Sequence, residues 1–193
     1  ESDTEVLLQL YAEKGEAMLG DLRGMFAFAI WDAREQAVLL ARDPYGIKPL
    51  YYADDGWTLR FASQVKALLA GGKISQVPEP AGVVGFYLFG SVPEPYTLYQ
   101  DMRSVPAGCA IWVDDVGPRE PRAYFSPARI WAKAEGHPRI DADGTAELVR
   151  SAVRDSVRHH MVSDVPVGAF LSSGIDSGAL VGLMSELGNP SEL

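Results

Sequence analysis

The sequence contains a single cysteine, Cys109, among its 193 residues, which excludes an internal disulfide. No apolar run approaches the roughly 18 residues that a membrane-spanning helix needs. The chain starts at Glu1, with neither an initiator methionine nor a signal-peptide pattern. These absences predict a cytoplasmic protein without a membrane partner, and a sequence that is a fragment of a longer chain.

Basic residues are also scarce. The 17 lysines and arginines stand against 26 acidic residues, so the formal net charge is −9, and the basic residues form no cluster. This balance argues against a nucleic-acid partner, whose phosphates attract a basic surface. The sequence is rich in apolar residues, with 47% hydrophobic and 10% aromatic side chains. They suffice to bury the core of one domain, or of one domain and part of another.

The first two thirds of the chain show the patterns of helices and antiparallel strands. Apolar residues recur at helical spacing over residues 3–22, where Ser2 or Asp3 can cap the first turn and Gly15 interrupts the run. One broken helix or two short ones are therefore expected. Two strand pairs with short turns and then two helices should follow: 25–32 with 37–43, 49–54 with 58–63, 64–70 and 79–90. AIWVDD and PRAYFS could add edge strands.

The composition turns polar over residues 131–144, which suits a linker between a first domain, 1–130, and a second unit, 145–193. TAELVRSAVRDSVRHHM has helical spacing, and VPVGAFLSS, residues 165–173, has the composition of a fully buried strand. IDSGALVGLMSEL is again helical. The order of helix, buried strand, glycine turn and helix is typical of the opening of a doubly wound parallel sheet.

The turn from Ser172 to Ser177 allows two interpretations. Backbone N–H groups, the two serine hydroxyls and the helix dipole could together hold a pyrophosphate. The same serines and Asp176 could instead simply cap the helix that follows. The turn alone does not decide between an anion site and a cap.

Several stretches, taken in order, resemble one family. SDVPVGAFLSSGIDS resembles the pyrophosphate loop of glutamine-dependent asparagine synthetases, whose usual form is SDVP, a strand and SGGxDS. GMFAFAIWD, ARDPYGIKPLYY and FASQVKALL resemble the class II glutamine amidotransferase domain that precedes the synthetase domain in that family. SDTEVLL resembles the segment whose aspartate, Asp3 here, contacts the α-amino group of glutamine.

The resemblance implies two folds. The first is an incomplete α+β domain of antiparallel sheets and helices, like the N-terminal-nucleophile amidotransferases. The second is the start of an α/β domain with a parallel sheet, like the adenine-nucleotide α-hydrolases.

The resemblance also implies a reaction. An N-terminal cysteine, which this chain does not carry, would attack the glutamine amide with the terminal amine as base. The released ammonia would displace AMP from an aspartyl adenylate formed with ATP and Mg²⁺, leaving pyrophosphate. The implied partners are glutamine, aspartate and ATP, and a homodimer is compatible with them.

The pyrophosphate loop carries over residue by residue. The implied ATP-binding and pyrophosphate-binding residues are Ser172, Ser173, Gly174, Asp176 and Ser177. Ser173 departs from the family's usual glycine, so its backbone should have an ordinary φ, or nucleotide binding is weakened. Gln64 likewise replaces the glutamate usual in FASE, which puts a buried ion pair in doubt.

Other noticeable residues have structural interpretations. Arg42 and Asp43, with Gly46 and Pro49, should fix a turn and a domain-facing ion pair rather than catalyse. Cys109 lacks a neighbouring histidine and the terminal position of a nucleophile, so we interpret it as packing. His159 and His160 are adjacent on a helix and point in different directions, which argues against a shared metal site.

Two alternatives remain open at this stage. The same scaffold could serve a related ATP-dependent amidotransferase that acts on another carboxylate in a biosynthetic cluster. The polypeptide could also be a non-catalytic remnant or an interaction module. Flanking sequence would separate these alternatives from an asparagine synthetase.

Overall fold

Two antiparallel hairpins form the centre of the first part of the chain. In the computed structural model, which describes residues 2–135 and 141–188, β1 (Ala27–Asp32) pairs with β2 (Ala37–Arg42). β3 (Tyr51–Asp54) pairs in the same way with β4 (Leu59–Ala62). Both expected strand pairs are confirmed.

The strands belong to two sheets. The larger has the order β1-β2-β6-β7, with β8 (Arg122–Ala123) also beside β6 (Cys109–Asp114), and β7 spans Gly117–Pro118. The smaller has the order β4-β3-β5, where β5 is Arg103–Ser104. AIWVDD was expected at an edge, and this is wrong, because β6 has β2 on one side and β7 and β8 on the other.

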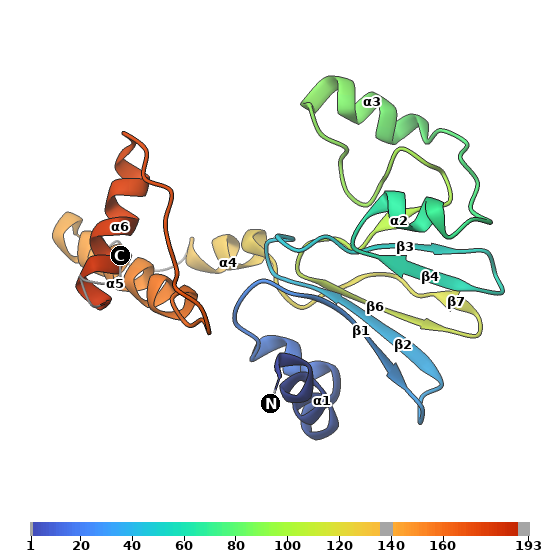
Figure 1. Cartoon of the computed structure of the whole chain (residues 1–193), viewed down its shortest axis with the longest axis horizontal. Coiled ribbons are helices and arrows are strands. Elements are labelled where there is room, and N and C mark those ends of the chain that lie inside the picture. The colour runs from blue at the N-terminus through green and yellow to red at the C-terminus, as the bar shows by residue number, and fades with distance from the viewer. Residues whose placement is uncertain (1, 136–140, 189–193) are drawn as a thin grey trace. The chain divides into compact units, whose positions relative to one another are not determined.

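The two sheets face each other across a shared core. Side chains alternate along a strand, so Leu40 of β2 points toward the small sheet, while Leu39 points to the opposite face. The inner cluster joins Leu40 and Ile111 of the large sheet to Tyr52 and Leu59 of the small one. The outer face of the large sheet packs Leu39 and its neighbours against the segment before β1. Figure 1 shows the two sheets stacked, with α1 below and α2 above.

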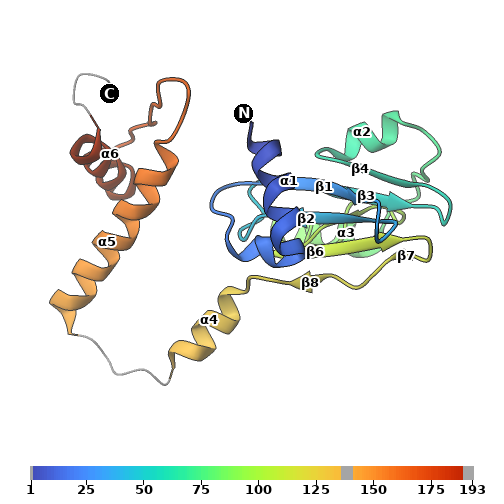
Figure 2. The same ribbon diagram turned by 90° about the horizontal axis from the view of Figure 1, so that it is seen from below.

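Helices cover both outer faces. α1 (Asp3–Lys14) and the 3₁₀-helix η1 (Gly15–Gly20) lie over the large sheet, which confirms two short helices interrupted at Gly15. α2 (Val65–Ala70) covers the small sheet with Leu68, and α3 (Pro80–Phe89) follows it. Figure 2 shows α1 lying across β1 and β2. This first part of the chain is therefore α+β with antiparallel sheets.

The chain divides into two units, residues 1–132 and 133–193, and α4 (Pro127–Ala134) runs across their boundary. The first residues of the expected linker are thus helical, and residues 136–140 of that linker lie outside the described ranges. The second unit holds α5 (Ala142–His160) and α6 (Ile175–Leu187). Val157 of α5 and Leu183 and Met184 of α6 form its buried core.

The expected strand over residues 165–173 is not formed. The segment has no regular secondary structure, and Phe170 and Leu171 are exposed. A strand of a parallel sheet is held by backbone hydrogen bonds to neighbouring strands. The described residues of the second unit contain no strand, so this segment has no strand partner there. The start of an α/β sheet is therefore not seen in this structure.

Among the described residues, no helix has both the length and the apolar character needed to cross a bilayer.

Candidate functional site

Asp3 is the first residue of α1 and is exposed. Ser2 occupies the N-cap position, but no side chain caps this helix end, so the expected cap from Ser2 or Asp3 is not formed. Within residues 2–135 and 141–188 the structure records no hydrogen bond or ion pair of the Asp3 carboxylate. The carboxylate is thus not used as a cap and is available to a ligand.

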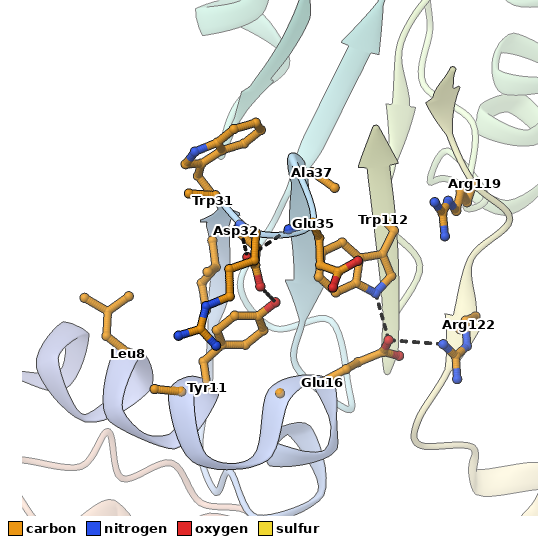
Figure 3. Close-up of a pocket in the computed structure, with 15 residues that line it drawn as sticks. Leu8, Tyr11, Glu16, Trp31, Asp32, Glu35, Ala37, Trp112, Arg119 and Arg122 are labelled. Carbon is orange, nitrogen blue, oxygen red and sulfur yellow. Dashed lines mark hydrogen bonds and ion pairs between the residues drawn. The ribbon is translucent and has the colours of Figure 1, made fainter. Parts of the chain in front are cut away.

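The helix that carries Asp3 is attached to the sheet through few groups. None of its residues is buried. The Tyr11 hydroxyl donates a hydrogen bond of 2.7 Å to Asp32 Oδ2 at the end of β1. One turn later, Glu16 accepts hydrogen bonds from the Trp112 indole at 2.8 Å and from Arg122 at 3.1 Å. Figure 3 shows Tyr11 directed at Asp32 and Glu16 between Trp112 and Arg122.

Asp32 is a well-defined acceptor. Besides the Tyr11 hydroxyl, its carboxylate accepts the backbone N–H groups of Arg34 at 2.8 Å and Glu35 at 3.2 Å, which closes the turn between β1 and β2. These donors hold the pKa of Asp32 below its ordinary value, the tyrosine hydroxyl most of all. Burial, followed by the hydrogen bond to Asp32, raises the pKa of Tyr11 far above its ordinary 10.0.

The same residues line an open pocket of about 720 Å³ between α1, η1, the β1–β2 turn and β6. Its walls include Trp31, Trp112 and three arginines, and Figure 3 draws them. Its charged groups are largely paired with protein groups: Arg122 with Glu16, Asp32 with Tyr11, and Arg119 with the nearby Asp114. Asp3 does not line it. We therefore interpret these polar contacts as holding α1 and η1 on the large sheet rather than as a binding site.

Arg42 and Asp43 fix a turn, as the sequence predicted. Asp43 is fully buried, and its carboxylate accepts the N–H groups of Tyr45, Ile47 and Lys48. The Arg42 guanidinium forms its ion pair with Glu94, at 2.5 Å. The partner lies in the loop after α3, within the first unit, so the expected domain-facing ion pair is wrong, and sequence reasoning did not identify Glu94.

The turn after residue 171 brings three of the implied pyrophosphate residues together. Ser172 Oγ lies 2.8 Å from Ser177 Oγ and accepts the N–H of Gly174 at 3.2 Å. The Ser177 hydroxyl also accepts the N–H of Ser172 at 3.2 Å. Gly174 is the N-cap residue of α6, and no side chain caps the first turn. Ser172 thus holds the N–H of Gly174, while for the N–H groups of Ile175, Asp176 and Ser177 the described residues show no cap by a serine or by Asp176.

Ser173 and Asp176 complete this loop. The non-glycine residues with positive φ that the described chain contains are Gln36 and Lys73, so Ser173 has an ordinary φ. Its side chain therefore causes no backbone strain. Asp176 lies in the first turn of α6, and the structure records no hydrogen bond or ion pair for it within the described ranges.

Two other candidate residue types are accounted for structurally. Cys109 is 8% exposed in β6, and burial raises the pKa of its thiol. His159 Nδ1 lies 2.7 Å from the Asp155 carbonyl, and His160 Nδ1 lies 2.8 Å from the Ser156 carbonyl, so each imidazole has its own backbone partner. In the part of the chain that the structure describes, no three His, Cys, Asp or Glu side chains are grouped to hold a metal ion.

Comparison with known families finds a match in each part of the chain. The model of the glutamine amidotransferase domain matches residues 1–125, and the asparagine synthase model matches residues 148–192. The chain belongs to the glutamine amidotransferase domain family, in agreement with its two antiparallel sheets.

Its curated relatives are named glutamine-hydrolysing asparagine synthetases. Asparagine synthetase 1 of Bacillus subtilis strain 168 is 40% identical over 187 residues, which cover 96% of this chain and 28% of that protein. Asparagine synthetase B of Escherichia coli K12 is 37% identical over 186 residues, 93% of this chain and 26% of that protein. The chain thus spans little more than a quarter of the length of these relatives.

Proposed function

We propose that this chain is part of a glutamine-hydrolysing asparagine synthetase, in which ammonia from glutamine is transferred to the ATP-activated side-chain carboxylate of aspartate. The observation that carries the proposal is the order of the two family matches on one chain, amidotransferase first and asparagine synthase second. The names of the relatives support the same assignment.

In the amidotransferase part, Asp3 would bind the ammonium group of glutamine. The support is its exposed carboxylate, which is not used as a helix cap. An ion pair between this carboxylate and the substrate ammonium would orient the side-chain amide for attack. Removing one partner of a desolvated charge pair typically costs a few kcal/mol, so glutamine use should depend strongly on Asp3.

In the synthetase part, the loop 172–177 would bind the phosphates of ATP, which supplies the adenylyl group that activates the acceptor carboxylate. The uncapped N–H groups at the start of α6 fit an anion, and the hydroxyl pair of Ser172 and Ser177 holds the loop in shape. Ser173 adds a hydroxyl without backbone strain, and Gly174 leaves room for a close approach. Mg²⁺ would accompany the phosphates, with Asp176 as the nearest candidate carboxylate of this loop.

The remaining parts of the proposal concern organisation. Residues 1–130 would form the amidotransferase domain, 131–144 the linker and 145–193 the start of the synthetase domain. There, residues 165–173 would become a strand once neighbouring strands of a parallel sheet are available. The substrates would be small molecules rather than nucleic acid, given the net charge of −9. A homodimer and a cytoplasmic location are also part of the proposal.

The test measures glutamine hydrolysis and ATP-dependent activation of the acceptor separately, in the full-length protein. Asp3→Asn should raise the KM for glutamine and leave synthesis from free ammonia intact. Asp176→Ala and Ser177→Ala should reduce pyrophosphate release with ATP, Mg²⁺, aspartate and ammonia about a hundredfold, the effect of losing about 3 kcal/mol of preorganised stabilisation. Their glutaminase activity should survive.

Matched controls lie on comparable helix positions. Asp143 is the second residue of α5, as Asp176 is of α6, and Glu13 is exposed on the same helix as Asp3. Asp143→Ala and Glu13→Gln should leave both activities unchanged. Normal pyrophosphate release from Asp176→Ala with only a lowered melting temperature would contradict the ATP site. Equal losses of Asp3→Asn with glutamine and with ammonia would contradict the glutamine site.

A further inference from the structure

Helix α1 reaches the position of Asp3 with little apolar packing to hold it. None of its residues is buried, and Val6 and Leu8 are 54% and 53% exposed. A 12-residue helix is marginal in water without tertiary contacts, so its few contacts with the sheet determine where it lies. The direction of the helix therefore depends on a small number of specific side chains.

Two groups of contacts connect α1 to the sheet, one just after its C-terminal end and one at Tyr11. At its C-terminal end, η1 buries Met18 and Leu19 almost completely, and Glu16 binds Trp112. In the body of the helix, the Tyr11 hydroxyl contacts the end of β1, 2.7 Å from Asp32 Oδ2. Asp3 lies about two helical turns before Tyr11, and within the described ranges no hydrogen bond or ion pair of its carboxylate is recorded.

Asp32 is suited to fix the direction of α1, because its own carboxylate is held in place. Its other carboxylate oxygen is held by two backbone N–H groups of the β1–β2 turn, so the acceptor cannot rotate freely. β1 and β2 are paired throughout, up to Asp32 beside Ala37. The Tyr11 ring packs in turn against the outer cluster that contains Leu39. The hydrogen bond thus joins the helix to a rigid part of the sheet.

We propose that Tyr11 and Asp32 are positioning residues, and that their hydrogen bond sets the direction of α1 and so the place of Asp3 in the glutamine site. The inference rests on the proposed function of Asp3. Tyr11 lies eight positions after Asp3, about 12 Å along the helix at a rise of 1.5 Å per residue. Because the helix is stiff, a small change of direction at Tyr11 moves Asp3 by a distance that matters for an ion pair.

The experiment uses the full-length protein with Tyr11→Phe, which removes only the hydroxyl. The KM for glutamine should rise about tenfold, while kcat with saturating glutamine and synthesis from ammonia change little. Asp32→Asn, which keeps one acceptor oxygen, should show a smaller rise. The double variant should show less than the product of the two effects, because both changes remove the same contact.

Tyr124→Phe is the matched control. Its hydroxyl also donates a hydrogen bond on the outer face of the large sheet, to the Arg42 carbonyl at 2.6 Å, and this bond does not involve α1. Its KM for glutamine should equal that of the unsubstituted protein. A second measurement uses amide hydrogen exchange without any substrate. Tyr11→Phe should speed exchange in α1 but not in β2, and Tyr124→Phe should leave α1 unchanged.

The outcomes distinguish this inference from the proposed function. If Asp3→Asn impairs glutamine use but Tyr11→Phe does not, the positioning role is wrong and the glutamine site stands. If Tyr124→Phe raises the KM as much as Tyr11→Phe, the effect is general loosening and the positioning role is again wrong. If Asp3→Asn leaves glutamine use unchanged, both are wrong, even if exchange in α1 responds to Tyr11→Phe.

Discussion

At the scale of single residues, Arg42 shows how a charge is accommodated in the interior. Its guanidinium donates hydrogen bonds to the carbonyls of Lys48, Val105 and Gly46, and to the Glu94 carboxylate. Its side chain is only 9% exposed. A lysine has a single ammonium group and cannot reach acceptors spread over a planar fork. This site therefore depends on the shape of arginine as much as on its charge.

Tyr11 and Tyr124 give the first prediction at this scale. Burial raises the pKa of both phenols far above 10.0, with Asp32 and Asp43 as the nearby negative charges. A raised folded pKa favours the neutral form, so this stabilisation is complete below pH 10 and is lost as the pH rises through the folded-state pKa. Alkaline conditions should therefore unfold the chain as these phenols ionise.

The measurement is an absorbance titration of tyrosinate in the 193-residue chain. Tyr11→Phe and Tyr124→Phe should not change the amplitude of the phase near pH 10, because neither residue ionises there in the folded state. In guanidinium, where the chain is unfolded, each variant should lose one tyrosine from that phase. A loss of amplitude near pH 10 from the folded Tyr11→Phe variant would contradict the burial of this hydroxyl.

Sequence patterns predicted the contacts between residues close together in the chain, but they missed the contacts between residues far apart. The contacts among Ser172, Gly174 and Ser177 join residues at most five apart, so the turn pattern could indicate them. The Tyr11–Asp32 bond joins residues 21 apart, and Arg42 and Glu94 are 52 apart. Tyr11 is noticeable in the sequence only as one apolar residue of a helical pattern. No local signal gives the partner of a side chain across a fold.

At the scale of elements, α3 is unusual because its glycines are buried while large apolar side chains are exposed. Gly82 and Gly85 are its buried residues, while Tyr87, Leu88 and Phe89 are exposed. The helix lies so close to the following loop that a Cβ atom at Gly82 would be 1.9 Å from the Thr97 carbonyl oxygen. At Gly85 it would be 2.2 Å from the Pro93 ring.

Gly82→Ala should therefore destabilise the first unit, although alanine is the better helix former. Overpacking typically costs about 1–3 kcal/mol, which exceeds the propensity gain of up to about 1 kcal/mol. Gly20→Ala is the control, since a Cβ there meets nothing within 4 Å and its φ is not positive. Denaturant unfolding should show a lower midpoint for Gly82→Ala alone. Equal midpoints for both variants would mean that α3 can move away from the loop.

Element types were predicted better than element neighbours. Alternating and helical patterns gave both hairpins and the helices, because these patterns are local. The wrong edge assignment of β6 and the missing strand at 165–173 have a common cause. Whether a segment is central, at an edge or unpaired depends on residues elsewhere, as with Val38 beside Val113. The apolar composition of residues 165–173 fits a strand, but composition does not supply a partner.

At the scale of the whole molecule, the 193-residue chain by itself should release no ammonia from glutamine. Its one cysteine is buried in β6, and the raised pKa of Cys109 keeps it as the thiol, whereas attack on an amide needs the thiolate. Ammonia release from purified chain and glutamine is the measurement, with Cys109→Ala as the control. Turnover that disappears in Cys109→Ala would overturn the structural interpretation of this cysteine.

The segment of residues 165–173, which has no strand partner in the second unit, should also influence how copies of this chain associate in solution. Val165, Phe170 and Leu171 expose between 67% and 102% of their surface, and exposed apolar side chains favour association with other copies. The net charge of −9 opposes such contacts over a Debye length of about 10 Å at 0.1 M ionic strength. Salt shortens that range, and acid removes the charge itself. Repulsion should therefore be strongest, relative to this apolar attraction, in a neutral buffer of low ionic strength.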